Sequence, residues 1–163
     1  MKLLNFVIAT ALNTPWWAWL FFAWIIFVGI RRLHYRQVYL PLLCLPPFLM
    51  FLPKYKIFFS GNYQLIGYLL LSTIIGQIIG AIMGMRVNIK IFKPTWFIGI
   101  PGAYCPLFFF LSFVVAKYVF AFLQVTQPDT AAYYFMLDTM ATGFLAGMFA
   151  GEAKAYFYRF YKY

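Results

Sequence analysis

Acidic residues are almost absent from this sequence. Its 163 residues include three Asp or Glu against 13 Lys or Arg, and charged residues of all kinds make up 10%. A soluble domain with so few charges could not keep its surface hydrated. Hydrophobic residues reach 65%, against the roughly 45–50% that is typical of soluble domains. Together with a mean hydropathy of +0.82, this composition predicts an integral membrane protein.

Groups for catalysis and metal binding are also scarce. The chain has one His, and its two cysteines, Cys44 and Cys105, have no further Cys or His to complete a ligand set for a soft metal. Two cysteines are also too few for a disulfide framework. The motifs of zinc proteases, serine hydrolases, phosphate-binding loops and dithiol oxidoreductases do not occur. We therefore expect a non-enzymatic protein with no cofactor and no bound metal.

Long uncharged stretches predict one transmembrane domain over 1–163 with about five spans, because a helix needs roughly 20 residues to cross the hydrocarbon core. Residues 3–13 are expected to form a short N-terminal interfacial helix ahead of the first span. Three prolines, Pro41, Pro46 and Pro47, should shorten and kink the second span. The predicted fold class is an all-α polytopic membrane helix bundle. The expected spans cover about 15–30, 38–53, 63–85, 100–125 and 134–155.

Positive charge is divided unequally between the expected loops. With the N-terminus outside, three basic residues lie outside, namely Lys2, Lys54 and Lys56, and nine lie in the cytoplasm. This bias predicts an N-out, C-in orientation. The basic residues do not form one patch, so membrane lipids with anionic headgroups are the expected partners and nucleic acid is not. The nine are Arg31, Arg32, Arg36, Arg86, Lys90, Lys93, Lys154, Arg159 and Lys162.

Glycines recur at intervals of four residues in the third and fifth expected helices. Such glycines lie on one helix face and let a neighbouring backbone approach closely. The faces would serve packing within the bundle, an oligomer contact or a substrate groove, and the sequence leaves these alternatives open. The glycines are Gly76, Gly80, Gly84, Gly143, Gly147 and Gly151.

The chain also contains a candidate internal repeat. The second and fourth expected helices both end near a Lys-Tyr pair, Lys54-Tyr55 and Lys117-Tyr118, and the third and fifth both carry the glycines. Duplication of a helical hairpin in one orientation would give this pattern, which occurs as parallel repeats in transporters. Chance similarity between apolar helices would give it too, and the sequence does not decide between them.

Three of the polar residues inside expected spans are candidate site residues: Gln77, Lys117 and Asp138. A charge left unpaired near the bilayer centre costs about 2.5–3.5 kcal/mol on insertion scales. Lys117 and Asp138 should lie level in the outer part of the bilayer and approach each other across the fourth and fifth helices. The alternatives are an ion or proton relay, or a Lys117 that snorkels to the headgroups. Gln77 is expected to hydrogen-bond a neighbouring helix or to contact a substrate.

Several short stretches carry a family resemblance: Thr14 to Trp19, Gly29 to Arg32, Leu40-Pro41, Pro101 to Leu107, Lys117-Tyr118 and the glycines of the fifth helix. They resemble a family of small bacterial inner-membrane proteins known only as a domain of unknown function. That family tends to have Ser where this chain has Ala103. A more distant likeness is to CcdC-type proteins associated with cytochrome c biogenesis. The resemblance implies the topology and a bacterial inner (plasma) membrane, and it implies no activity.

Two functions remain from the sequence, beside a weaker third. The first is a structural or accessory subunit whose glycine faces pack against itself as a homo-oligomer or against a partner in a membrane complex. The alternative is a small oligomeric transporter or channel for an ion or small solute, and an intramembrane enzyme is the weakest. A wide polar cavity containing Gln77 and Lys117 would favour transport. A dry core with an exposed glycine face would favour the accessory role.

Overall fold

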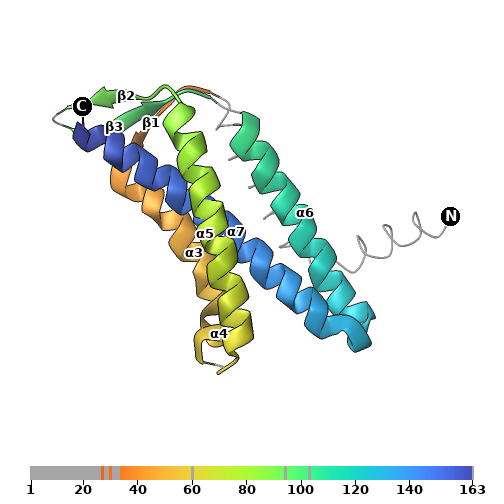
Figure 1. Ribbon diagram of the computed structural model, residues 1–163. Helices are drawn as coiled ribbons and strands as arrows, with labels where there is room; N and C mark the ends of the chain where they lie inside the picture. Colours follow the sequence, from red (N-terminus) through yellow and green to blue (C-terminus); the bar gives the residue numbers. More distant parts are fainter. Residues whose placement is uncertain are drawn as a thin grey trace.

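The computed structural model describes residues 34–59, 61–93, 95–102 and 104–162, together with Phe27 and Ile30. The span expected at 15–30, apart from those two positions, and the interfacial helix expected at 3–13 lie outside the described residues. What is described is mostly helical, which agrees with the predicted all-α class (Figure 1).

Three long helices account for most of the described chain. They lie close to the expected spans at 63–85, 100–125 and 134–155, and the last is longer at both ends than expected. The Asn62 side chain accepts a hydrogen bond from the Leu65 amide, 3.3 Å away, and so caps the first of them. The helices are α5 (Tyr63–Arg86), α6 (Tyr104–Thr126) and α7 (Ala131–Lys162), and η3 (Pro128–Thr130) precedes α7.

A stepwise helical stretch covers residues 40–59, where a kinked span at about 38–53 was expected. Three of its segments begin with a proline within their first two positions. Proline has no amide hydrogen to donate, so it is tolerated at the start of a helical segment and interrupts a longer helix. The segments are η1 (Leu40–Cys44), α3 (Leu45–Phe51), η2 (Leu52–Lys54) and α4 (Tyr55–Phe59).

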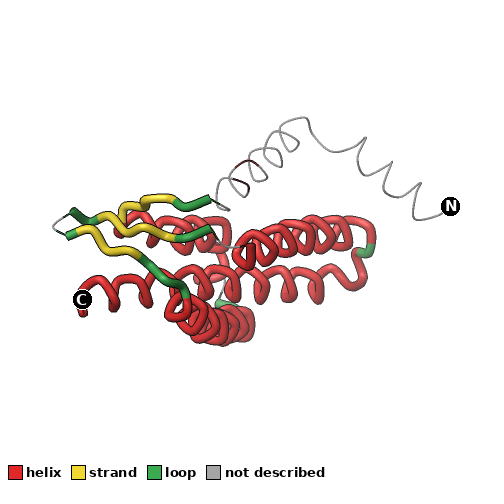
Figure 2. The backbone as a smooth tube through the Cα atoms, turned by 90° about the horizontal axis from the view of Figure 1, so that it is seen from above, coloured by secondary structure: helices red, strands yellow, loops and turns green. Residues whose placement is uncertain are grey.

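A small antiparallel sheet, which the sequence analysis did not predict, lies at one end of the helices (Figure 2). Its strands are β1 (Arg36–Tyr39), β2 (Lys90–Phe92) and β3 (Phe97–Ile100), in the order β1-β3-β2. We call this the sheet end. The opposite end, with residues 61–62 and 127–130, is the loop end.

The described chain consists of two halves with the same order of elements. The first half (36–86) runs from β1 through the stretch 40–59 to α5, and the second (97–162) runs from β3 through α6 to α7. The two leading strands pair antiparallel, with Arg36 opposite Ile100 and Tyr39 opposite Phe97. This arrangement is the one that a duplicated hairpin in a single orientation would produce.

The glycine ladders of α5 and α7 face each other and hold the two halves together. A Cβ atom added at Gly80 would overlap the backbone of Met148, and one at Gly147 would overlap the backbone of Thr73. Gly76 and Gly151 are equally close to backbone atoms of the facing helix, and Gly84 is close to Glu152 and Ala155. Figure 1 shows the two helices crossing. Of the three alternatives, these contacts match packing within the bundle.

Among the residues that the structure describes, one helix, α5, is long and apolar enough to cross a membrane. Its outward face carries large apolar side chains that are 43–57% exposed, namely Leu70, Leu71, Ile74, Ile75, Ile78 and Ile82. Contiguous apolar surface of this kind is unusual on soluble monomers and marks contact with lipid or with another protein. The five-span arrangement remains a prediction.

Candidate functional site

The most deeply placed charges of the described chain meet at Asp138, in the second turn of α7. Its Oδ2 atom lies 2.5 Å from Nζ of Lys54, which η2 supplies from the first half. The same ammonium donates to Oγ1 of Thr139 at 3.5 Å and lies 4.6 Å from the ring centre of Phe135. The side chains of Lys54 and Asp138 are 7% and 12% exposed, so this ion pair is buried.

A second lysine approaches the other oxygen of the same carboxylate. Nζ of Lys117, on α6, lies 2.9 Å from Oδ1 of Asp138, which is ion-pair contact without hydrogen-bond alignment. Lys117 instead donates a hydrogen bond to Oγ1 of Thr142 at 2.9 Å, and that hydroxyl donates to the backbone carbonyl of Asp138 at 2.7 Å. We call Lys54, Lys117 and Asp138 the lysine–aspartate cluster.

The predicted approach of Lys117 and Asp138 is therefore present, but the pair has a third member. Lys54 was expected in an outer loop, and this expectation was wrong: the residue is 6% exposed and lies in the helical stretch 40–59. The stretch continues past position 53 through η2 into α4, and η2 brings Lys54 into contact with Asp138 of α7. The Lys-Tyr pair in each half was the sequence signal that could have indicated Lys54 as a third member, because both lysines reach Asp138.

Lys117 lies along α6 about where the sequence placed it. Lys117 follows the first residue of α6 by 13 positions and precedes the last by nine, so it lies near the middle of the helix. At 1.5 Å per residue, about 14 Å of helix separate it from the loop end. Its ammonium contacts Asp138 and Thr142 of α7 there.

The remaining predicted site residues do not join the cluster. Gln77 is half-buried on α5, and no hydrogen bond of its side chain to the described part of the chain is found. Its backbone carbonyl lies against Gly151 instead. Gln77 and Lys117 line neither of the cavities described in the molecule. The six glycines serve the α5–α7 contact.

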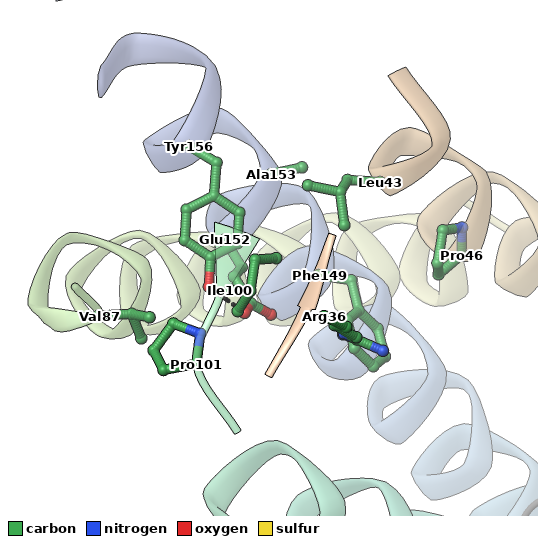
Figure 3. Close-up of a pocket in the computed structure, with 10 residues that line it drawn as sticks. All are labelled: Arg36, Leu43, Pro46, Val87, Ile100, Pro101, Phe149, Glu152, Ala153 and Tyr156. Carbon is green, nitrogen blue, oxygen red and sulfur yellow. Dashed lines mark hydrogen bonds between the residues drawn. The ribbon is translucent and has the colours of Figure 1, made fainter. Parts of the chain in front are cut away.

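A second polar group lies at the sheet end, around a cavity of about 50 Å³ (Figure 3). The Tyr156 hydroxyl donates a hydrogen bond of 2.6 Å to Oε1 of Glu152 one turn earlier on α7. Arg36 lines the same cavity from β1, and the Arg159 guanidinium donates to the backbone carbonyl of Val87. Most of its lining is apolar, with polar groups from Arg36, Glu152 and Tyr156, and a volume of this size has room for a few water molecules, since one water needs roughly 10–15 Å³.

Burial is the main reason why the pKa of Tyr156 is raised far above its usual value of 10.0, and the neighbouring Glu152 carboxylate raises it further. The positive charges of Arg36 and Arg159 oppose these effects. The phenol is therefore a neutral hydrogen-bond donor to Glu152 throughout the physiological pH range. Glu152 is half-buried against this ring.

Apolar side chains separate the two polar groups along the same face of α7. Leu145 and Phe149 are 2% and 6% exposed, and they pack with Met50 of α3 and with Phe109 and Phe113 of α6. Among the described residues, this apolar cluster therefore lies between the two polar groups on that face of α7.

The donor set does not favour a metal. Within the ranges that the structure describes, no three His, Cys, Asp or Glu side chains come together. Cys44 is exposed on η1, and the side chain of Cys105 is not among those that the structure describes. No protein family, curated protein or solved structure matches the chain.

Proposed function

We propose that this chain is a multi-pass protein of a bacterial plasma membrane and that it acts as a non-enzymatic structural or accessory subunit. The observation that carries the proposal is the outward face of α5, whose apolar side chains are about half exposed. In a membrane these side chains contact lipid or a partner helix, whereas water would oppose their exposure.

The distribution of charge supports an N-out, C-in orientation. Seven basic residues of the described chain lie at the sheet end, which we assign to the cytoplasm. At the loop end Lys56 is exposed, while Lys54 is drawn into the bundle by Asp138. Removing Lys54 from the outer loops leaves nine inner charges against Lys2 and Lys56, so the bias is stronger than the sequence alone indicated. The seven are Arg36, Arg86, Lys90, Lys93, Lys154, Arg159 and Lys162.

An accessory role would use a surface other than the glycine faces, because those are covered within the chain. The exposed apolar faces of α5, α6 and the stretch 40–59 are candidate surfaces for a second copy or a partner. Purification of the full chain from native membranes in mild detergent, followed by mass spectrometry of the intact assembly, tests this role. We expect a homo-oligomer or a stoichiometric partner. A monomer that carries lipid alone would contradict the proposal.

Orientation has its own test. Single cysteines at Asn62 and Asp129, in a chain without Cys44 and Cys105, should react with an impermeant thiol reagent added to intact cells. Cysteines at Arg32 and Phe92 should react after the membrane is opened. Labelling of Phe92→Cys in intact cells would contradict the N-out, C-in model.

Transport of an ion or small solute is the second candidate, and one observation favours it. The lysine–aspartate cluster takes Lys54 from the first half and Lys117 and Asp138 from the second. In transporters built from repeats, sites of this kind lie at the interface between the repeats. Proteoliposomes with the wild-type chain would show a solute or ion flux that Asp138→Asn abolishes. Equal flux in the two preparations would remove this candidate.

A further inference from the structure

The lysine–aspartate cluster does not balance its own charge. Two ammonium groups, those of Lys54 and Lys117, share the single carboxylate of Asp138. The cluster therefore carries one surplus positive charge. The rings of Phe135 and Phe113 lie 4.6 and 5.5 Å from the two ammonium nitrogens, and their faces attract cations without supplying a negative charge.

No other acidic side chain of this protein neutralises the surplus. The complete sequence contains three acidic residues, and the two besides Asp138 are Asp129 and Glu152. Asp129 is exposed in η3 at the loop end. Glu152 follows Asp138 by 14 residues on α7, which is about 21 Å along the helix, and it accepts the Tyr156 hydrogen bond. A negative charge for the cluster must come from outside the chain.

The surplus charge is accessible at Lys117 and not at Lys54. The Lys117 side chain is 34% exposed, whereas the side chains of Lys54 and Asp138 are 7% and 12% exposed. An ammonium group has three N–H donors. Thr142 engages one of those of Lys117, and the contact with Asp138 lacks hydrogen-bond alignment, so donor capacity remains at Lys117 for a further acceptor.

From this imbalance we infer that Lys117 binds a singly charged oxyanion, which completes a neutral set with Lys54 and Asp138. The Thr142 hydroxyl positions the ammonium for this contact, because it accepts from Lys117 while its own proton is held by the Asp138 carbonyl. A phosphodiester of a lipid headgroup, a free carboxylate and the dihydrogen phosphate ion share this chemistry. A bound oxyanion lowers the cost of a surplus cation in low dielectric, so it stabilises the folded state.

The test compares the full-length wild-type chain with Lys117→Met and with Lys56→Met. Lys56 is an exposed lysine on α4, outside the cluster, and provides the matched control. Lys117→Met leaves the neutral Lys54–Asp138 pair intact, so it should fold. Lys117→Arg keeps the positive charge and should keep anion binding, which supplies a second variant that does not depend on the folding of Lys117→Met.

Two arms distinguish the sources of the anion. In the first, acetate or inorganic phosphate is titrated at constant ionic strength into delipidated protein in nonionic detergent, and the shift of the unfolding temperature is followed. In the second, nanodiscs of phosphatidylglycerol are compared with nanodiscs of phosphatidylcholine, and retained lipids are counted by native mass spectrometry. We expect saturable anion binding in one arm. Lys117→Met should weaken this binding at least tenfold, whereas Lys56→Met and Lys117→Arg should preserve it.

A response in the first arm identifies a free anion, and a response in the second identifies a lipid headgroup. The proposed site is wrong if Lys117→Met and Lys56→Met give the same anion response in both arms. It is also wrong if Lys117→Arg loses a response that Lys56→Met keeps. In that case the cluster keeps its surplus positive charge with no anion bound. Neither result depends on the accessory role, because no partner protein enters the measurement.

Discussion

Nζ of Lys54 lies 2.5 Å from Oδ2 of Asp138, although the two residues are 84 positions apart in the sequence. The contact joins the helical stretch 40–59 of the first half to α7 of the second. Lys117 reaches the other oxygen of the same carboxylate. Two lysines from different halves thus share Asp138 as their counter-ion. Each substitution in the cluster should therefore have a different effect on stability.

Substitutions in the lysine–aspartate cluster should not be equivalent. Asp138→Asn leaves two neighbouring cations and should destabilise most, by about 3–5 kcal/mol, the range for removing one partner of a buried pair. Lys54→Met should cost less, and Lys117→Met least, because a neutral pair remains in each. Thermal unfolding in detergent measures the order. If Lys117→Met is the most costly, the cluster does not behave as a triad.

The effect of Lys54→Met should change sign with its background. In the wild type it removes the buried partner of Asp138 and destabilises. In Asp138→Asn it removes one of two uncompensated cations and should therefore raise the unfolding temperature. Unfolding of the two single variants and the double variant forms the cycle. Additive effects would show that the two residues are uncoupled.

Gly80→Ala and Gly67→Ala should have opposite effects, although both lie in α5. A Cβ at Gly80 meets the Met148 backbone, which cannot move aside cheaply, whereas a Cβ at Gly67 meets nothing within 4 Å. Gly80→Ala should separate α5 from α7 and lower the unfolding temperature, and leucine at Gly80 or Gly147 should be more severe. Gly67→Ala should stabilise by about 0.5–1 kcal/mol, since alanine favours helix over glycine. A neutral Gly80→Ala would indicate that the ladders are not in contact.

A disulfide should form between β1 and β3 in the observed register. Tyr39 and Phe97 are opposite each other, and both are exposed. With Cys44 and Cys105 replaced by serine, Tyr39→Cys with Phe97→Cys should cross-link under mild oxidation, because directly opposite positions bring Cβ atoms to about 4.5–5.5 Å. Tyr39→Cys with Gly99→Cys is two residues out of register and should cross-link far less. Equal cross-linking in the two variants would contradict the register.

Stability should fall above about pH 10, with a contribution from Tyr156. The raised pKa means that the folded state keeps the phenol proton while the unfolded chain loses it above its ordinary value of 10.0. Folding is then opposed by about 1.4 kcal/mol per pH unit in this range. Tyr156→Phe should lack this slope, while Tyr158→Phe, an exposed tyrosine two residues further on, should retain it. Chemical unfolding at pH 9 to 11 gives the comparison.

Composition and spacing were enough to predict the long helices, since α5 at Tyr63–Arg86 differs little from the expected 63–85. The glycine spacing also indicated that a close helix contact exists, but not which helix supplies it. Depth along the helices predicted the Lys117–Asp138 approach. These features depend on local sequence and on the cost of isolated charge, which are readable without a structure.

Other features depend on contacts that no local pattern specifies. Lys54 was assigned to a loop because Pro53 and a charged residue normally end a span, and only the distant carboxylate of Asp138 makes its burial favourable. The strands β1, β2 and β3 have three or four residues each, among basic residues that indicated loops. Their hydrogen-bond partners lie in the other half or across a short turn, so the pairing appears only in three dimensions.

The pairing of β1 with β3 is self-complementary: the first residue of each strand lies opposite the last residue of the other. Two identical subunits related by a two-fold axis make contacts of this isologous kind. A fragment limited to one half would therefore find its missing strand in a second copy of itself. At the lysine–aspartate cluster the halves differ, because the first half contributes a lysine and the second contributes a lysine with its counter-ion. A homodimer of second halves would be electrically balanced at that site, whereas a homodimer of first halves would bring two bare cations together.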